Sequence, residues 1–558
     1  MAKLEIDAIA DLIRELAARM ELAGADRYRA RAYKRAADNL VLTATPLPEL
    51  IAQNRLTEIP GVGDSLAAVI TQLHETGRYP LIESLREQLP AGVLELLRIP
   101  GLRADRIRKL HRELGISSIA ELEAAARSGR LQSIKGWGPS FQSKVLQSIE
   151  MSRAVRGRHL HRASIAMEYA RTDLARVHPE WTVCQAGELR RGCEIVYKLV
   201  LVAMDPSLAE EMRTTQIGDE VILHVASRNL FGAALLLATG SEAHLAALGE
   251  LAQRKGLTLD ERGLHSSGRV IPTETEQEIY TALGLPFIPP ELRESGNEIS
   301  LALRGKLTGL ITRQDIRGVL HAHTKQSDGA DSLEDMAEAA EQQGYEYLGL
   351  TDHSQTAHYA GGLTVDEVYQ QQRAIDALNR RLGSSFHVFK GIESDILADG
   401  SLDYDEKVLR SFDLIIASVH SRFRMNREEL TARIVRAVQN PYTTILGHVT
   451  GRLLLRRPGY ELDMEKVLSA CAAHGVAVEI NANPWRLDLD WRWCQRALEL
   501  GCMLSINPDA HSTREIDNAR WGVLMARKGA VPKERVVNRL DRKDFAAYLG
   551  ERKRRAAE

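Results

Sequence analysis

The sequence predicts a multidomain chain: an all-α domain, then an α+β domain, then a C-terminal α/β domain built on a barrel-like parallel sheet. Its 558 residues are several times the roughly 100 to 200 residues of one domain. Apolar residues recur at helical spacing first, then in a mixed pattern, and finally in short strands that alternate with helices. With 44% hydrophobic and 27% charged residues, wholesale disorder and a collagen-like fibre are excluded.

The charge balance and the length of the apolar runs limit which kinds of partner the protein can bind. The 73 basic and 75 acidic residues give a net charge of -2, so any nucleic-acid site must be local. The longest uncharged apolar runs, at 199–204 and 233–238, are far shorter than the roughly 20 residues that span a bilayer. No apolar signal segment opens the chain, so we expect a cytoplasmic protein without a membrane partner. Five cysteines without a C-x-x-C pair suggest neither a disulfide framework nor a thiolate zinc site.

The first domain, residues 1–150, is expected to consist of helices separated by glycine turns. Residues 59–63, Ile-Pro-Gly-Val-Gly, precede an apolar helix at 66–73 and resemble a helix-hairpin-helix, whose glycine turn and helix N-terminus approach a phosphate. The turn recurs at 99–103, with Arg103 in place of the second glycine, and at 134–138. Three such turns predict sequence-independent binding to the DNA backbone. The candidate contacts are Gly61, Gly63, Gly101, Gly136 and Gly138.

A basic run precedes the first of these turns. It contains Arg29, Arg31, Lys34 and Arg35, interleaved with Tyr28 and Tyr33. Such a run suits a segment that grips a DNA strand by phosphate contact and base stacking. A solvated helix face explains the pattern almost as well.

The second domain, residues 151–312, is expected to be α+β. Strand-like runs cover 194–203 and 221–226, and helical patterns cover 161–177 and 241–256.

The third domain, residues 313–558, alternates short apolar strands with longer helical patterns, which indicates parallel strands in a barrel-like α/β fold. The seven predicted strands are 318–320, 347–350, 387–390, 414–417, 444–446, 477–479 and 503–506.

Metal-ligand residue types follow nearly every one of these strands. Strand ends converge on one face of a parallel barrel, so residues far apart in sequence can share one pocket. Imidazoles with carboxylates suit Zn, Mn or Fe, and nine ligands are too many for one ion, so we expect two or three divalent ions. The nine are His321, His323, Asp328, His353, Glu393, His420, His448, Asp509 and His511.

These motifs resemble the PHP (polymerase and histidinol phosphatase) domain, a distorted (β/α)7 barrel with a trinuclear metal site. The resemblance implies three metal positions and hydrolysis of phosphoesters by a water molecule whose pKa the metals lower. The implied ligand sets are His321, His323, Glu393 and Asp509; Glu393, His420 and His448; and Asp328, His353 and His511. Zn or Mn is expected, with Fe as a further option.

Arg452, four residues after His448, is the candidate catalytic clamp for a phosphate oxygen. A solvated arginine in a basic loop with Arg456 and Arg457 fits the sequence equally well.

The domain order resembles the bacterial family X DNA polymerases over essentially the whole chain. Further support comes from residues 186–191, Ala-Gly-Glu-Leu-Arg-Arg, from Thr239-Gly240-Ser241 with His244, and from 284–293. The resemblance implies a nucleotidyltransferase-like palm and thumb at 151–312.

The polymerase carboxylates of that family are missing here. Its Asp-x-Asp pair falls on Lys198 and Val200, and its third Asp falls on Ile222. Mg needs hard oxygen ligands, and a lysine places positive charge where two cations must sit. Glu188 also occupies the serine position of the nucleotide-binding turn. The nearby acids Glu194, Asp205, Asp219 and Glu220 do not have the spacing to replace the lost pair.

We therefore expect a metal-dependent nuclease that acts on DNA 3′ ends in repair, with polymerase activity lost. Exonuclease, 3′-phosphatase and abasic-site endonuclease activities are open, and the partner is gapped, nicked or 3′-ended DNA. The alternatives are an active repair polymerase, a small-molecule phosphatase of the histidinol phosphate type, and a non-enzymatic DNA-binding scaffold.

Overall fold

The computed structural model describes residues 4, 6–24, 27–41, 43, 45–99, 102–134, 137–153, 157–217 and 221–557. The chain divides into two compact units, Met1–Arg156 and Gly157–Glu558. The predicted boundary near residue 312 lies inside the second unit, so the three-domain division stays a prediction. No helix among the described residues is long and apolar enough to cross a membrane. All five cysteines are free thiols.

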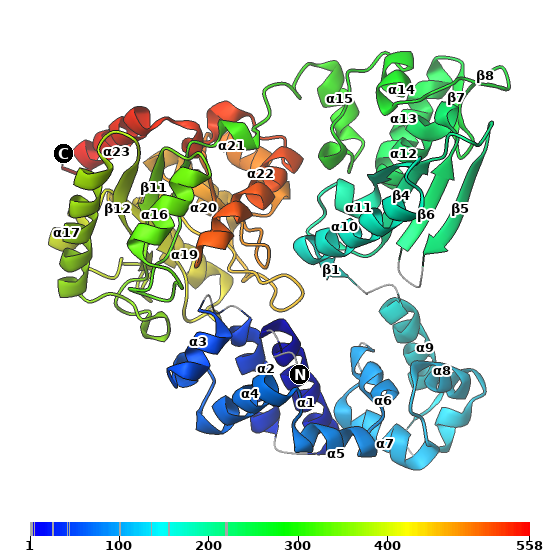
Figure 1. The fold of residues 1–558 in the computed structure, drawn as a ribbon, viewed down its shortest axis with the longest axis horizontal. Helices are drawn as coiled ribbons and strands as arrows, with labels where there is room; N and C mark the ends of the chain where they lie inside the picture. Colours follow the sequence, from blue (N-terminus) through cyan, green and yellow to red (C-terminus); the bar gives the residue numbers. More distant parts are fainter. Residues whose placement is uncertain are drawn as a thin grey trace. The chain divides into compact units, whose positions relative to one another are not determined.

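The described part of the first unit is entirely helical (Figure 1). Its apolar side chains form two separate clusters, one around Ile13 and Leu73 and one around Leu96 and Ile107. The α-helices are α1 (Ile6–Ala23), α2 (Arg27–Leu40), α3 (Leu47–Ala52), α4 (Asp64–Thr76), α5 (Pro80–Gln88), α6 (Ala91–Glu95), α7 (Ala104–Leu114), α8 (Ile119–Arg127) and α9 (Pro139–Arg153).

The three predicted glycine turns share one backbone pattern. Each begins with a 3-10 turn: η1 (Leu56–Glu58), η2 (Leu96–Arg98) and η3 (Arg130–Ser133). An isoleucine follows and its carbonyl accepts from the amide three residues on, at 2.9 Å, 3.1 Å and 3.0 Å in chain order. A helix then starts, namely α4, α7 or α9. The described residues that flank the three turns therefore repeat one backbone pattern, and those beside the middle copy with Arg103 follow it as well.

The first part of the second unit contains α10 (Leu160–Val177) and a four-stranded sheet of order β2-β4-β6-β5, in which β4 and β6 run parallel. The strand predicted at 194–203 is wrong as one element: it breaks at Tyr197 and Lys198, and its first part pairs with β1 in a separate sheet. The strands are β1 (Arg158–His159), β2 (Thr182–Gln185), β3 (Ile195–Val196), β4 (Leu199–Met204), β5 (Met212–Ile217) and β6 (Val221–Ala226).

A helical layer and a small three-stranded sheet follow. Ser241 caps α13 by accepting from the amide of His244, which places the helix start one residue after the predicted one. These elements are α11 (Gly187–Arg190), η4 (Arg228–Leu230), α12 (Phe231–Thr239), α13 (Glu242–Arg254), β7 (Leu257–Asp260), β8 (Gly263–Ser266), β9 (Arg269–Val270), α14 (Glu276–Ala282), η5 (Pro290–Leu292), α15 (Asn297–Leu303) and η6 (Arg313–Asp315).

The rest of the unit is a parallel barrel of seven strands in chain order, and every predicted strand of this segment is confirmed. Most of these strands are buried on both faces, which explains their continuous apolar runs. The bridge between Ala322 and Ala510 joins the ends of the first and last strands and nearly closes the barrel. The strands are β10 (Gly318–Val319), β11 (Tyr347–Leu350), β12 (His387–Asp395), β13 (Leu414–Ser418), β14 (Ile445–Leu446), β15 (Ala477–Asn481) and β16 (Leu504–Asn507).

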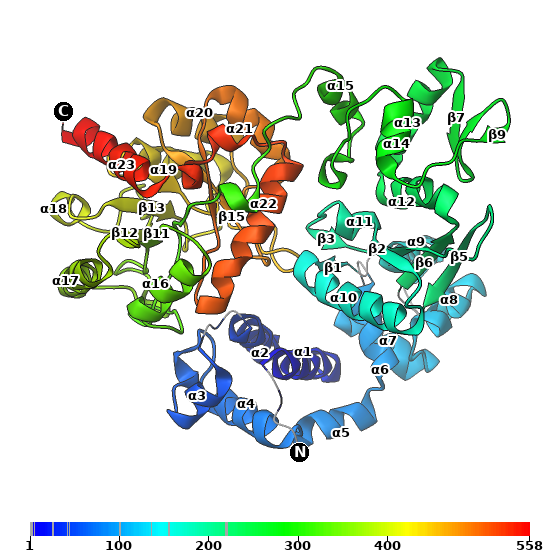
Figure 2. The ribbon, with the colours of Figure 1, turned by 45° about the horizontal axis from the view of Figure 1, so that its top comes forward.

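Helices surround the barrel strands on the outside (Figure 2). Capping boxes at Ser332, Thr364 and Asn426 start three of them, α16, α17 and α19. The helices and 3-10 turns are α16 (Leu333–Gln342), η7 (His358–Ala360), α17 (Val365–Leu382), α18 (Glu406–Leu409), α19 (Arg427–Gln439), α20 (Met464–His474), η8 (Trp491–Trp493), α21 (Cys494–Leu500), η9 (Thr513–Asn518), α22 (Ala519–Lys528), η10 (Lys533–Arg535), η11 (Val537–Arg539) and α23 (Arg542–Ala557).

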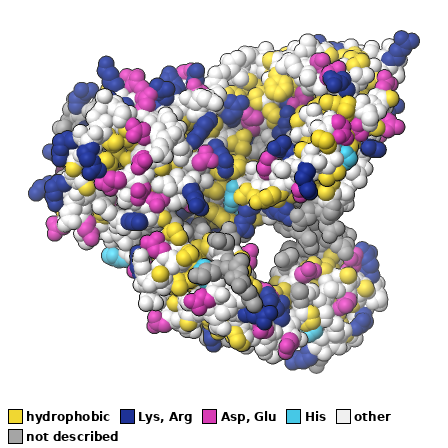
Figure 3. All heavy atoms as spheres, in the orientation of Figure 1, with side chains coloured by type: hydrophobic (Ala, Val, Ile, Leu, Met, Phe, Trp, Pro, Cys, Tyr) yellow, Lys and Arg dark blue, Asp and Glu magenta, His cyan; other side chains and the backbone are white. Residues whose placement is uncertain are grey.

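Acidic and basic side chains are interspersed on the face of the molecule in Figure 3. This agrees with the balanced composition.

Candidate metal centre

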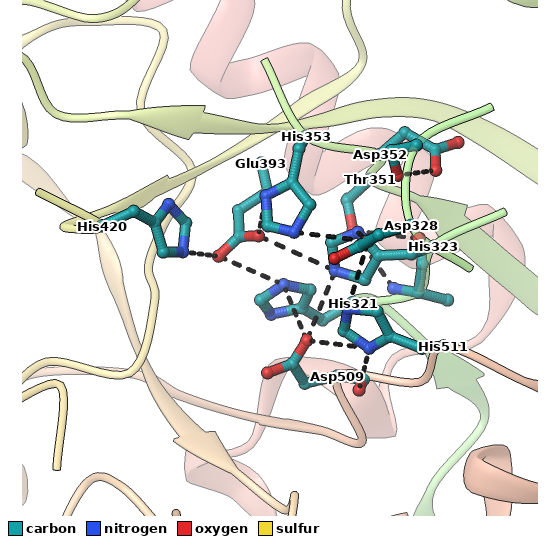
Figure 4. A network of polar contacts seen from close by, with 12 residues as sticks. His321, His323, Asp328, Thr351, Asp352, His353, Glu393, His420, Asp509 and His511 are labelled. Atoms are coloured by element: carbon teal, nitrogen blue, oxygen red, sulfur yellow. Dashed lines mark hydrogen bonds and ion pairs between the residues drawn. The ribbon is translucent and has the colours of Figure 1, made fainter. Parts of the chain in front are cut away.

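The nine predicted ligands lie in one group at the carboxyl end of the barrel, and Figure 4 labels eight of them. Glu393 belongs to β12, and the other eight follow the strands β10, β11, β13, β14 and β16. Six of the nine are at most 5% exposed: His321, His323, His353, Glu393, His448 and Asp509. The strand register therefore gathers ligand-type residues from almost 200 positions of sequence.

The Glu393 carboxylate lies at the centre of the group. Nitrogen atoms of five histidines lie within ion-pair distance of its two oxygens: His321 at 3.4 Å, His323 at 3.7 Å, His353 at 3.0 Å, His420 at 3.3 Å and His448 at 3.0 Å. A carboxylate shared in this way has the position of a bridging ligand, which is the place that the resemblance to PHP domains implies for it.

Asp328 and Asp509 lie on either side of His323. Asp328 Oδ1 is 3.5 Å from His353 Nε2 and 3.3 Å from His511 Nε2. Asp509 Oδ1 is 3.5 Å from His321 Nε2 and 3.3 Å from His323 Nε2. Asp509 has a φ of 52°, a conformation that costs a non-glycine residue about 1–3 kcal/mol and is concentrated at functional sites.

The donor set fits divalent metal ions. Buried ring nitrogens of His321, His323, His353 and His448 have no hydrogen-bond partner among the described residues, and such atoms are costly unless something binds them. Three groups have ligand atoms within 4.8 Å of one another: His323, Asp328, His353 and His511; His321, His323 and Glu393; and His353, Glu393 and His420. The groups overlap the implied ligand sets without reproducing them, because Asp509 and His448 lie outside all three.

Charge within the group favours the ligand form of its carboxylates and of His323, whereas nearby carboxylates outweigh burial and raise the pKa values of His321, His420 and His511. Burial alone would raise the pKa values of Glu393, Asp328 and Asp509, but the surrounding histidines hold all three well below the usual range. Burial, with His511 and His353 nearby, lowers the pKa of His323 to about 3. Ionised carboxylates beside a neutral imidazole are the forms that bind a metal.

Glu479 supports the ligand group through a hydrogen bond to His321. The sequence analysis did not select this residue. It is fully buried in β15, and its Oε1 is 2.6 Å from His321 Nδ1. A carboxylate only accepts, so Nδ1 carries the proton and Nε2 is left free to face Glu393 and Asp509. The signal was a charged residue within the otherwise apolar run 477–480.

Asp395 and Asp352 have comparable roles. Asp395 Oδ1 is 2.6 Å from His420 Nδ1, which turns His420 Nε2 toward Glu393. Asp352 accepts from the amide and hydroxyl of Thr324, at 2.7 Å each, and so fixes the segment that carries Asp328. Carboxylates that orient metal-binding histidines are a common second layer of metal sites.

The structure does not bring Arg452 into the group. Its guanidinium is 13% exposed and contacts Asp490 at 2.6 Å, Glu194 at 3.4 Å and the carbonyl of Arg486 at 3.0 Å. All three of its guanidinium nitrogens are engaged in these structural contacts. The structure therefore contradicts the prediction that Arg452 clamps a phosphate oxygen. Arg486 lies closer to the group: its Nε is 3.7 Å from Asp509 Oδ2.

The predicted DNA contacts of the first unit are only partly described. Gly61 adopts a φ of 88° and Gly63 precedes α4, so both lie in the turn as expected. Gly138 is exposed in the third turn, at the start of α9. Gly101 and Gly136 lie outside the described residues.

The basic run lies on α2, where its predicted members Arg29, Arg31, Lys34 and Arg35 are all exposed. Asn39 of the same helix donates to the carbonyl of Pro60 at 2.5 Å, which joins α2 to the first glycine turn. Tyr33 is only 5% exposed and packs in the core, so the expected stacking on Tyr33 is wrong.

The palm positions lie together but lack acids. Val200 and Ile222 are paired across the parallel strands β4 and β6, and Val200 packs in an apolar cluster with Ala234. Glu188 accepts from the amide of Lys198 at 3.0 Å. Glu194 is held by Trp491, Arg452 and Arg492, which removes it as a substitute ligand. Asp219 and Glu220 lie outside the described residues.

Comparison with known proteins agrees with this geometry. Family models match at residues 7–79 (helix-hairpin-helix domain), 234–294 (DNA polymerase beta thumb) and 320–483 (PHP domain). The DNA polymerase/3′-5′ exonuclease PolX of Bacillus subtilis (strain 168) is 34% identical over 96% of this chain and 98% of its own length.

The chain belongs to the PolX family.

PolX membership makes the C-terminal barrel a PHP domain, and PHP domains are metal-dependent. The thumb and helix-hairpin-helix matches imply DNA binding. The PHP part also resembles probable phosphatases, from Thermoanaerobacter sp. (strain X514) at 27% identity over 42% of this chain and 95% of that protein. A probable phosphatase of Vibrio parahaemolyticus is 28% identical over 41% of this chain and 91% of that protein.

Proposed function

We propose that this PolX protein is a metal-dependent nuclease that removes nucleotides from DNA 3′ ends, and that it has lost DNA polymerase activity. The observation that carries the proposal is a contrast between two sites of one chain. The PHP centre has nine ligand-type side chains around Glu393, whereas the palm has Lys198, Val200 and Ile222 where the family has carboxylates.

The PHP residues would perform three tasks. His321, His323, Asp328, His353, Glu393, His420, His448, Asp509 and His511 would hold two or three divalent ions. Such ions lower the pKa of an attacking water and neutralise charge on the phosphate oxygens. Glu479 and Asp395 would keep His321 and His420 turned toward them. Zn and Mn suit this donor set best.

Arg486 would hold the phosphate of the substrate. Its side chain is 20% exposed, and its ion pair with Asp509 is long at 3.7 Å. The guanidinium can therefore turn to a phosphate oxygen without breaking a strong contact, and its planar fork matches phosphate geometry. Arg452, engaged with Asp490 and Glu194, would act only by holding the backbone that carries Arg486.

Loss of polymerase activity is supported by the surroundings of the palm positions. Val200 is 7% exposed within an apolar cluster, and Lys198 is exposed directly before β4. Two Mg ions need oxygen ligands at these positions. Of the described acids nearby, Glu188 is directed to the backbone, Glu194 to arginines and Asp205 to Ser207. A palm of this kind would serve as a scaffold or a guide for DNA.

The helical unit would present the DNA. Its glycine turns and the exposed Arg29, Arg31, Lys34 and Arg35 suit contacts to a phosphate backbone. Gapped, nicked or 3′-ended DNA is the proposed substrate. A role in repair and a cytoplasmic location stay predictions from the sequence.

The proposal is tested with single-stranded DNA labelled at its 5′ end. Protein loaded with Mn or Zn should shorten the DNA from its 3′ end, and EDTA or the variant His323→Ala should abolish the shortening. Cleavage that continues in both would contradict the PHP centre as the source of activity.

Phosphomonoester hydrolysis is the second candidate, because the PHP part resembles probable phosphatases over nearly their whole length. Competition between a 3′-phosphorylated oligonucleotide and histidinol phosphate distinguishes an enzyme that acts on DNA ends from a small-molecule phosphatase. Preference for histidinol phosphate would favour the small-molecule phosphatase. The helical DNA-binding unit would then have no role in the reaction.

A further inference from the structure

One exposed aromatic side chain lies beside the metal centre and has no role in it. Tyr359 is 47% exposed. Its ring centroid is 6.2 Å from that of His353 and 6.3 Å from that of His420. Single exposed aromatic residues are common on protein surfaces. This one is distinguished by lying next to two candidate ligands.

The segment that carries Tyr359 is fixed at both ends. It connects β11 to α17 and forms the 3-10 turn η7 (His358–Ala360). The amide of Ser354 donates to Glu393 O at 3.1 Å, and the amide of Leu363 donates to His353 O at 2.9 Å. A Cβ at Gly362 would lie 1.9 Å from Ser354 O, so only glycine fits this closure. Tyr359 is therefore presented from a rigid support.

Side contacts hold the same segment. Thr356 donates from its amide and hydroxyl to the Asp403 carboxylate, at 2.7 Å and 2.8 Å, and Gln355 donates to Asp403 O at 2.7 Å. No hydrogen bond joins the Tyr359 hydroxyl to another described residue. The ring is held in place by its backbone while its surface stays available.

Cationic side chains also lie on segments near the candidate ligands. Arg486 lies beside Asp509, and Arg422 and Arg424 are exposed in the segment that follows His420. An aromatic ring with cationic groups around it is the usual surface for single-stranded nucleic acid, since bases stack on rings and phosphates contact guanidinium groups. A phosphomonoester without a base would use the cations alone.

We infer that Tyr359 forms a subsite that stacks on the unpaired base of the 3′-terminal nucleotide whose phosphodiester lies at the PHP centre. This inference rests on the proposed function. Stacking requires that the base leave its neighbours, so the subsite favours single-stranded or frayed 3′ ends over fully paired ones. Specificity for DNA structure then resides partly in the PHP domain.

The first experiment compares Tyr359→Ala and Tyr359→Phe with the unaltered protein on two single-stranded oligonucleotides. One ends in a normal 3′ nucleotide and the other in a 3′ residue that lacks its base. Base stacking is worth about 1–3 kcal/mol, so Tyr359→Ala should raise KM on the normal end about 5- to 150-fold. Tyr359→Phe should stay close to the unaltered protein, and the base-free end should be cleaved equally by all three.

A second measurement reports stacking directly. The oligonucleotide carries the fluorescent base 2-aminopurine at its 3′ end and a phosphorothioate at the terminal linkage to slow hydrolysis. The unaltered protein and the control Tyr169→Ala, which alters a tyrosine that is 72% exposed on α10, should quench the fluorescence. Tyr359→Ala should not.

The outcomes separate the inference from the proposed function. An equal loss on both oligonucleotides, an unchanged KM for Tyr359→Ala, or quenching by Tyr359→Ala would overturn the subsite while leaving the nuclease intact. If the metal-loaded unaltered protein cleaves neither oligonucleotide, the proposed function is wrong and the subsite falls with it.

Discussion

Replacing Glu479 by Gln should loosen the metal centre without touching a ligand. Four groups surround the carboxylate: His321 Nδ1 and Asn507 Nδ2 at Oε1, 2.6 Å and 2.9 Å away, and the amide of His448 and Asn481 Nδ2 at Oε2, 2.7 Å and 3.1 Å away. All four donate. A glutamine keeps one oxygen, and its amide group meets two of these donors with donors of its own.

The magnitude follows from this count. Two hydrogen bonds to a charged group are lost, each worth about 1.5–3 kcal/mol, so unfolding of the second unit should become about 3–6 kcal/mol easier. Loss of the partner that orients a metal-binding histidine typically weakens metal affinity about 10- to 100-fold. Both effects share one cause, because His321 and His448 are held by the same carboxylate.

The assay combines urea unfolding with metal content per chain, measured by plasma mass spectrometry after titration with a chelator. The control is Glu428→Gln, which makes the same chemical change at an exposed residue at the start of α19. If Glu479→Gln unfolds at the same urea concentration as the control and retains metal equally well, the supporting role derived from these contacts is refuted.

Three further predictions concern neighbouring residues. Arg486→Ala should lower kcat/KM on DNA about 10- to 100-fold, as expected for one lost charge-assisted bond to phosphate. Its free energy of unfolding should stay within about 1 kcal/mol of that of the unaltered protein. Unchanged kinetics would contradict the role of Arg486 as the phosphate clamp. Arg452→Ala should instead destabilise the second unit by about 3–5 kcal/mol, because Asp490 and Glu194 lose a buried partner; unchanged unfolding in urea would contradict this. Burial lowers the pKa of His161 to about 3, below its usual 6.5, so the folded state binds fewer protons than the unfolded one. The stability that neutral His161 contributes is fully present above pH 6.5 and is lost as the pH falls toward 3. The free energy of unfolding then decreases by up to about 1.4 kcal/mol per pH unit. His161→Gln should weaken the pH dependence of the free energy of unfolding, measured in urea between pH 6.5 and 4. An unaltered pH dependence would contradict this prediction.

The sequence predicted the barrel well because its pattern is local. The seven strands of the PHP domain each contain a short apolar run, and six of them carry or precede ligand-type residues. Topology alone brings such residues together, so their convergence needed no knowledge of side-chain packing. The palm positions followed in the same way, since Val200 and Ile222 pair across adjacent strands.

What the sequence could not predict depends on side-chain direction. Arg452 was chosen for its proximity to His448 along the chain, yet its guanidinium turns to Asp490 and Glu194. Arg486 and Tyr359 lie on connecting segments whose course no periodicity describes. Tyr33 was read as a stacking residue, but at helical spacing it faces the core.

The most direct test of the account follows product length on a 5′-labelled primer-template with deoxynucleotides, using metal-reconstituted protein beside Asp509→Ala. The account predicts that the primer shortens, that Asp509→Ala abolishes the shortening, and that no primer is extended in Mg or Mn. Primer extension would contradict the interpretation of Lys198, Val200 and Ile222, and shortening that persists in Asp509→Ala would contradict the PHP centre as the nuclease.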